Sequence, residues 1–194
     1  MKLSLELTKD SPQEWIEAVM NDFPAFLQDH ADCERKASAM SMSLVAKYPD
    51  RTEIIPELIA TAVEELEHFE QVYTIMNNQG IQLAHEIKQD MYVKALLGLM
   101  KSDVEGRFLD RLLLGSIIEC RGAERFKMIY ENLDEGKLRH FYHELWASEA
   151  KHGNIFVKMA LIYFDEKRVY DRLQFLNEKE GGIMLALPIK AALH

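Results

Sequence analysis

The feature that most constrains this chain is a glutamate placed where the apolar pattern of a long helix calls for a hydrophobic residue. Glu65 stands in line with Leu58 and Val72 at a spacing of seven residues, and His68 follows three residues after it. At 3.6 residues per turn, Glu65 and His68 point the same way. The segment is therefore predicted to turn a Glu-x-x-His pair toward the interior.

The same arrangement occurs again later in the chain. Glu149 shares its row with Phe156, and His152 shares its row with Leu145 and Met159. Two further helical segments each place a single glutamate in a largely apolar row. These are Glu34, in the row of Leu27 and Ser41, and Glu119, in the row of Leu112 and Phe126.

Four inward-facing carboxylates need a shared cation, because a buried charge without a partner is strongly destabilising. Two divalent ions balance four carboxylates, and two imidazoles complete an oxygen and nitrogen set that iron or manganese accepts. One Glu from each of two helices, with Glu-x-x-His from each of two others, is the pattern of ferritin-like two-metal bundles. The predicted ligands, which are also the candidate catalytic residues, are Glu34, Glu65, His68, Glu119, Glu149 and His152.

The fold class expected from the periodicity is all-α, because apolar residues recur at spacings of three and four without sustained alternation. We expect a ferritin-like four-helix bundle with extra short helices and a C-terminal tail, forming one domain over residues 1–194. Ser11 and Glu14 are expected to form a capping box ahead of the first helix. The expected helices run over about 12–21, 24–48, 52–79, 103–133, 137–164 and 165–179, with a short helix within the crossover 81–101 and an apolar tail, IMLALPIKAALH, after Gly181-Gly182.

Composition excludes several classes of protein. No apolar run approaches the roughly 20 residues of a membrane span, and the first residues lack a secretory signal, so we expect no membrane association and a cytoplasmic protein. Without a CxxC pattern, Cys33 and Cys120 are interpreted as packing residues. The net charge is −9, but residues 98–194 carry equal numbers of acidic and basic side chains, which leaves a local basic patch open.

Other polar and aromatic residues are weaker candidates. Tyr73, Tyr142 and Tyr163 are more simply core tyrosines than donors of electrons to the centre. The remaining histidines do not share the helix face of the predicted ligands and are assigned to the surface or to positions that support a ligand. They are His30, His85, His140, His143 and His194.

Four stretches around the predicted ligands resemble one enzyme family. They read LQDHADCERKAS, EELEHFEQVYTIMNNQGI, FLDRLLLGSIIECRGAERF and LWASEAKH. Over about residues 12–178 the chain resembles the tRNA 2-methylthio-N6-isopentenyladenosine (ms2io6A) hydroxylases, which are non-haem di-iron monooxygenases. The resemblance implies that the same six residues bind two iron ions.

The resemblance also implies an activity and its partners. The implied reaction is O2-dependent hydroxylation of the isopentenyl group of 2-methylthio-N6-isopentenyladenosine (ms2i6A) at position 37, in the tRNA anticodon loop. Electrons would come from an external donor such as a ferredoxin or reductase, because the chain shows no flavin fingerprint or iron–sulfur cysteine set. The sequence leaves open whether the protein is a monomer or a dimer.

Binding of tRNA requires Lys and Arg near the site. The candidates, all in the second half of the chain, are Arg107, Arg111, Arg121, Arg125, Lys127, Lys167, Arg168 and Arg172. The chain departs from the family pattern at its end, which reads LALPIKAALH in place of an aromatic and basic tail.

Two other functions use the same kind of site. One is ferritin-like or rubrerythrin-like iron oxidation, storage or peroxide detoxification without an organic substrate. The other is a manganese catalase, which metal analysis and rapid peroxide breakdown would reveal.

Overall fold

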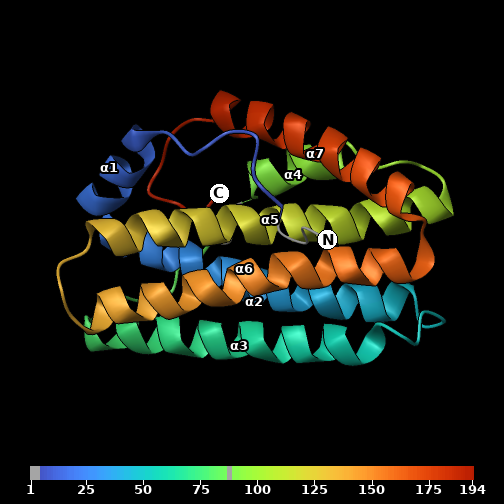
Figure 1. Cartoon of the computed structure of the whole chain (residues 1–194). Coiled ribbons are helices and arrows are strands. Elements are labelled where there is room, and N and C mark those ends of the chain that lie inside the picture. Colours follow the sequence, from blue (N-terminus) through green and yellow to red (C-terminus); the bar gives the residue numbers. More distant parts are fainter. Residues whose placement is uncertain (1–4, 87–88) are drawn as a thin grey trace. The chain divides into compact units, whose positions relative to one another are not determined.

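The computed structural model describes residues 5–86 and 89–194, and within these ranges it contains helices and no strand (Figure 1). The expected all-α class is confirmed. In the described ranges, no helix is both long enough and apolar enough to cross a membrane. The helices are α1 (Gln13–Asn21), α2 (Phe23–Lys47), α3 (Ile55–Asn78), α4 (Met91–Leu97), α5 (Val104–Asn132), α6 (Lys137–Tyr163) and α7 (Glu166–Ala186).

The described chain divides into two compact units, and the boundary falls inside α1. The α2–α3 unit comprises residues 18–86 and 190–193. The α5–α6 unit comprises residues 5–17, 89–189 and His194, and therefore also holds α4 and α7. The expectation of a single domain over residues 1–194 stays a prediction.

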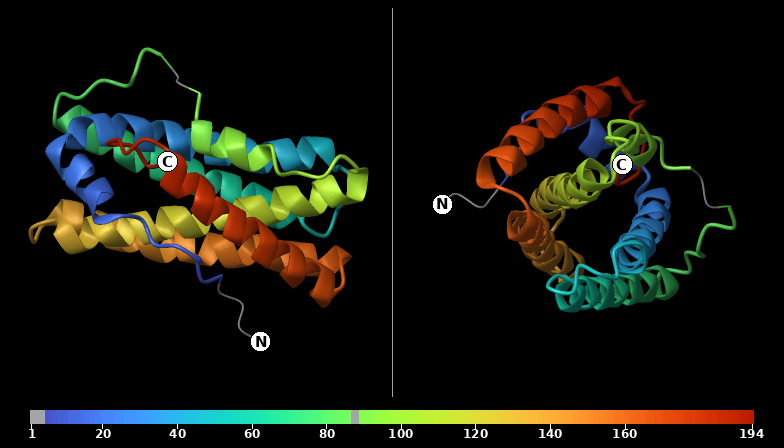
Figure 2. Two further views of the ribbon diagram at one scale, coloured as in Figure 1. Left: turned by 90° about the horizontal axis from the view of Figure 1, so that it is seen from above. Right: turned by 90° about the vertical axis from the view of Figure 1, so that its right-hand side faces the viewer.

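In the α2–α3 unit, two long antiparallel helices lie side by side (Figure 2). Asp22 caps α2 by accepting a hydrogen bond from the N–H of Ala25. Residues 52–54 form a turn, so α3 begins at Ile55 rather than at the predicted Thr52. Gly80, with φ of 72°, ends α3 as predicted, because a left-handed residue stops a helix and favours glycine.

In the α5–α6 unit, α5 and α6 form the second antiparallel pair, and α7 packs against both (Figure 1). Asp103 caps α5 and Asp165 caps α7, each through a backbone N–H three residues later. A Cβ on Gly115 would lie 3.2 Å from the ring of Phe156, so glycine lets the two long helices approach closely here.

Helix α7 differs from its prediction, because it runs through Gly181-Gly182 to Ala186 instead of ending near Lys179. Gly181 serves packing here. A Cβ at this position would lie 2.7 Å from Cγ of Lys9 and 3.0 Å from the hydroxyl of Thr8. The glycine leaves room for the N-terminal segment to cross α7.

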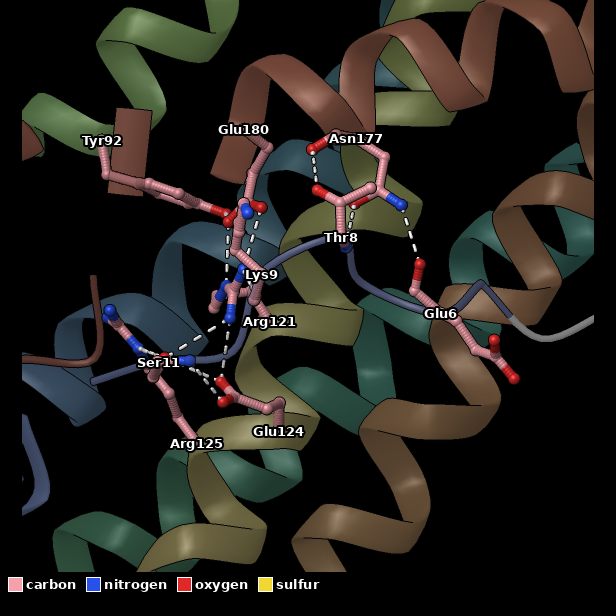
Figure 3. Close-up of polar contacts among 10 residues, drawn as sticks. All are labelled: Glu6, Thr8, Lys9, Ser11, Tyr92, Arg121, Glu124, Arg125, Asn177 and Glu180. Carbon is pink, nitrogen blue, oxygen red and sulfur yellow. Dashed lines mark hydrogen bonds and ion pairs between the residues drawn. The ribbon is translucent and has the colours of Figure 1, made fainter. Parts of the chain in front are cut away.

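A buried ion pair joins α5 to α7 (Figure 3). The guanidinium of Arg121 donates from Nε to Oε1 of Glu180 (2.8 Å) and from Nη2 to Oε2 (2.9 Å), and both side chains are fully buried. The Tyr92 hydroxyl on α4 also donates to Glu180, at 3.0 Å. Burial and the charge of Glu180 raise the pKa of Tyr92 well above its ordinary value, so the phenol stays protonated.

Ser11 belongs to the same polar network rather than to the predicted capping box with Glu14. Its N–H and hydroxyl both donate to the carboxylate of Glu124, at 2.7 and 2.8 Å (Figure 3). The Nε–H of Arg125 donates to the Ser11 hydroxyl at 3.1 Å, and its guanidinium lies 4.7 Å from the ring centre of Trp15. Burial lowers the pKa of Arg125 to about 10.

The predicted C-terminal tail docks partly as expected. The side chain of Leu193 is buried, and its N–H donates to Oδ2 of Asp29 at 2.7 Å. The ring of His194 stacks on Tyr92, with the ring centres 4.8 Å apart. Leu185 and Ile189 are exposed, so only part of the apolar tail is covered.

Candidate metal centre

The α2–α3 unit brings three of the predicted ligands together. Glu34 from α2 and the pair Glu65 and His68 from α3 are all buried, and one ligand atom of each lies within 4.8 Å of the others. Nδ1 of His68 is 3.5 Å from Oε2 of Glu65 and 3.7 Å from Oε2 of Glu34. These contacts exceed ordinary hydrogen-bond length and leave the atoms facing one another.

The α5–α6 unit repeats this triad. Glu119 from α5 and the pair Glu149 and His152 from α6 are buried, and one ligand atom of each lies within 4.8 Å of the others. Nδ1 of His152 is 3.5 Å from Oε2 of Glu149, the same separation as in the other pair. Each unit therefore supplies two carboxylates and one imidazole.

The apolar rows that predicted these positions are buried as expected. Leu58 and Val72 flank Glu65 in the interior face of α3, and Phe156 follows Glu149 on α6. Carboxylate oxygens with imidazole nitrogens form a donor set that suits iron and manganese. The residues of each triad therefore fit a shared metal ion, in donor chemistry and in spacing.

His30 is a further residue at the α2–α3 triad, which the sequence assigned only to the surface or a supporting position. Its side chain is fully buried, and Nε2 lies 2.7 Å from Oε1 of Glu34. The spacing of four residues on one helix was the available signal, because such residues are neighbours on a helix surface. A histidine in this place fixes one carboxylate oxygen and leaves the other, Oε2, facing His68.

The cysteines and tyrosines pack largely as the sequence suggested. The thiol of Cys120 occupies the space that Gly153 leaves open on α6, and burial raises its pKa to about 11. Cys120 is therefore a packing residue against α6, as interpreted from the sequence. Tyr142 is fully buried, whereas Tyr73 is exposed and lies outside the core.

The prediction of an RNA-contacting role is wrong for three of the candidate residues. Arg121 and Arg125 are buried in the network of Figure 3. Arg172 is largely covered, because its guanidinium donates to Asp110 at 2.7 and 2.8 Å and to the carbonyl of Leu99 at 2.8 Å. The remaining candidates with exposed side chains are Arg107, Lys127, Lys167 and Arg168.

Comparisons with known proteins agree on one family. The family model described as tRNA-(MS[2]IO[6]A)-hydroxylase (MiaE) matches residues 2–194. The tRNA 2-(methylsulfanyl)-N(6)-isopentenyladenosine(37) hydroxylase of Pseudomonas putida is 38% identical over 170 residues, covering 88% of this chain and 82% of the relative. The enzyme of the same name from Salmonella typhimurium is 25% identical, covering 91% of this chain and 82% of the relative.

A solved structure is similar over nearly the whole chain. It is a Synechococcus protein titled as having aldehyde deformylating oxygenase activity, with a TM-score of 0.90 and 28% sequence identity. The similarity covers 97% of this chain and 94% of that one.

Proposed function

The chain belongs to the tRNA-(MS[2]IO[6]A)-hydroxylase family, and from this premise we propose that it hydroxylates the isopentenyl group of 2-methylthio-N6-isopentenyladenosine at position 37 of tRNA. It is an enzyme, a tRNA hydroxylase, with a ferritin-like fold. The names of both relatives favour this function over iron storage or peroxide detoxification without an organic substrate. We place the protein in the cytoplasm with its tRNA substrate.

The catalytic centre in this proposal is formed by the two triads together. Glu34, Glu65 and His68 supply one half, and the matching triad of the α5–α6 unit supplies the other. The observation that carries the proposal is the repetition of a buried set of two carboxylates and one imidazole in each unit. Two divalent iron ions would balance the four carboxylates, and when bound they would supply the chemistry that activates O2.

The residues of the chain hold and insulate this centre. His30 fixes one oxygen of Glu34 by a hydrogen bond of 2.7 Å, which orients the other oxygen. Apolar side chains on the interior faces of the ligand-bearing helices, such as Leu58 and Phe156, are fully or nearly fully buried. In the proposal, this apolar surrounding keeps water away from the centre. A dry site protects a reactive oxidant from side reactions and strengthens the electrostatic interactions inside it.

The hydroxylation requires electrons from outside the protein. Conversion of C–H to C–OH with O2 places one oxygen atom in the product and the other in water, and consumes two electrons and two protons. An external electron-donor protein is therefore part of the proposal.

Metal analysis tests the ligand assignment. We expect Glu119→Ala and His152→Ala to lose most of the bound iron while the helical circular dichroism signal persists, because removing one ligand of a buried centre opens its coordination. Glu131→Ala, on an exposed part of α5, should retain wild-type iron. Full iron content in either ligand variant would overturn the assignment, and manganese in place of iron in the native protein would overturn the choice of metal.

Nucleoside analysis of tRNA tests the substrate. Cells that contain the protein should carry the hydroxylated isopentenyladenosine, and cells without it should carry only the unhydroxylated form. An unchanged nucleoside profile would reject this substrate.

A further inference from the structure

The exposed face of α3 carries a row of large apolar side chains. Ile59, Val63, Leu66 and Tyr73 are 44%, 50%, 51% and 44% exposed. Their spacing of four, three and seven residues places them in one stripe along the helix. We call these four residues the α3 stripe.

Packing of the α2–α3 unit does not account for this stripe. The interior face of α3 is formed by other apolar residues, among them Leu58, Ala62 and Val72, which are fully or almost fully buried. Single exposed apolar side chains are common, but four large ones along one helix face are typical of a surface that binds another molecule. The stripe therefore needs a partner of its own.

The charges of α3 restrict what that partner can be. The helix contains five glutamates and no lysine or arginine. Of these, Glu57, Glu67 and Glu70 are exposed, and Glu70 falls within the stripe itself, between Leu66 and Tyr73. An RNA backbone would be repelled here, and a second copy would bring the same negative face against this one. A partner with basic side chains around an apolar centre fits both features.

The position of the stripe points to the role of the partner. Leu66 directly follows Glu65 in the sequence. Ile59 lies six residues before Glu65, which is about 9 Å along the helix axis. Glu65 and His68 face the interior of the same helix. A protein docked on the α3 stripe would be separated from these ligands by little more than the thickness of one helix, about 10 Å.

We propose that the α3 stripe is the docking surface of the electron donor, a one-electron carrier protein whose redox group is ringed by Lys and Arg. This inference rests on the proposed function, which requires two electrons per turnover. The carrier is oxidised in two one-electron steps, and these electrons, with two protons and the two electrons of the C–H bond, reduce O2 to the product hydroxyl and water. Four apolar residues form a small contact, which suits the transient interfaces of redox partners rather than a permanent dimer.

Binding to the metal-free protein tests the surface independently of catalysis. The probe is cytochrome c, a redox protein with a basic rim around its haem edge, and an acidic plant-type ferredoxin is the opposite-charge control. We expect cytochrome c to bind weakly with strong salt dependence, and ferredoxin not to bind. Glu67→Gln/Glu70→Gln should raise the dissociation constant roughly fivefold or more. Asp134→Asn/Glu144→Gln, which removes the same charge from the α5–α6 unit, should leave it unchanged.

A second pair of variants tests the apolar part of the surface. Ile59→Gln/Leu66→Gln should weaken cytochrome c binding, and Val104→Gln/Ile162→Gln, which alters apolar residues on α5 and α6 that are more exposed still, should not. Glutamine keeps the helix propensity high, so loss of fold is not expected. Unchanged binding in both α3 variants, absent binding in the wild type, or preference for ferredoxin would overturn the proposal. So would sedimentation showing a wild-type dimer that Ile59→Gln/Leu66→Gln dissociates.

Chemical reduction separates this inference from the proposed function. Protein loaded with iron and reduced by dithionite needs no carrier, so the α3 variants should form as much hydroxylated tRNA in one turnover as the wild type. If the wild type forms no product under these conditions, the proposed function fails, while the binding experiments still decide whether the α3 stripe recognises a basic redox protein.

Discussion

At Glu34 a single hydrogen bond decides which carboxylate oxygen faces His68. His30 is fully buried and lies one turn before Glu34, with Nε2 2.7 Å from Oε1. We predict that His30→Ala lowers metal affinity about 10- to 100-fold, the effect typical of a residue that orients a ligand. A competition titration against a chelator of known affinity measures the change, and His140→Ala, an exposed histidine of α6, is the control. Equal affinities would show that Glu34 needs no support.

Gly153 on α6 is a second position where one residue matters, because Cys120 on α5 occupies the space beside it. A Cβ at Gly153 would lie 2.5 Å from Sγ of Cys120 and 3.3 Å from the carbonyl of Ser116. Gly153→Ala should therefore lower the free energy of unfolding by about 1–3 kcal/mol, as overpacking does. Urea denaturation measures this value.

Two further variants separate steric overlap from helix propensity. Cys120→Ala/Gly153→Ala should recover part of the loss, because the closest atom is gone. Gly182→Ala has open space around its Cβ and should be neutral or slightly stabilising in α7. If the double variant is no more stable than Gly153→Ala, the overlap with Cys120 is not the cause.

The sequence predicts the burial of the candidate ligands better than it predicts the burial of the arginines, for a physical reason. A glutamate such as Glu65 interrupts an apolar row, and the row itself reveals the burial. Arg121 gives no such signal, because its partner Glu180 lies 59 residues away on another helix and both residues look like ordinary surface charges. Only the folded chain shows that the two neutralise each other in the core.

At the scale of the helices, the Arg121–Glu180 pair fixes α7 on α5. Both side chains are fully buried, and the guanidinium makes two hydrogen bonds to the carboxylate. Glu180→Ala leaves Arg121 without its main partner, and breaking such a buried pair costs about 3–5 kcal/mol. We predict a loss of this size in denaturant unfolding.

A neighbouring glutamate provides the comparison for this helix. Glu178 is exposed on α7, and Glu178→Ala should change the free energy of unfolding by no more than about 0.5 kcal/mol. Similar losses in both variants would mean that α7 responds to any lost charge and that the buried pair has no special role.

Helix boundaries were also predictable where residues close in sequence set them, and not where a distant part of the chain is involved. Asp103, Asp165 and Gly80 act through their own backbone neighbourhood, so the starts of α5 and α7 and the end of α3 were predictable. Gly181 resembles a stop signal in sequence, yet it lies inside α7, at a point where Thr8 and Lys9 pack against it. A contact from the other end of the chain cannot be inferred from local pattern.

At the scale of the whole molecule, the proposed centre links metal binding to folding. Each unit supplies one buried triad, so metal that binds the native state alone must stabilise it. A free metal concentration of 100 times the dissociation constant adds about 2.7 kcal/mol per site to the free energy of unfolding. Each kcal/mol raises the Tm of a chain of this size by about 2–4 °C.

We therefore predict that chelation lowers Tm by several degrees. In Glu119→Ala and His152→Ala, the difference in Tm between the metal-loaded and the chelated protein should be much smaller. Differential scanning calorimetry under anaerobic conditions, with iron(II) or with redox-inert zinc(II), measures these Tm values.

The loaded protein should also unfold in one transition whose calorimetric and van't Hoff enthalpies agree, as expected if residues 1–194 form a single domain. Two separate transitions in the loaded protein would show that the α2–α3 and α5–α6 units fold independently and that the metal does not join them.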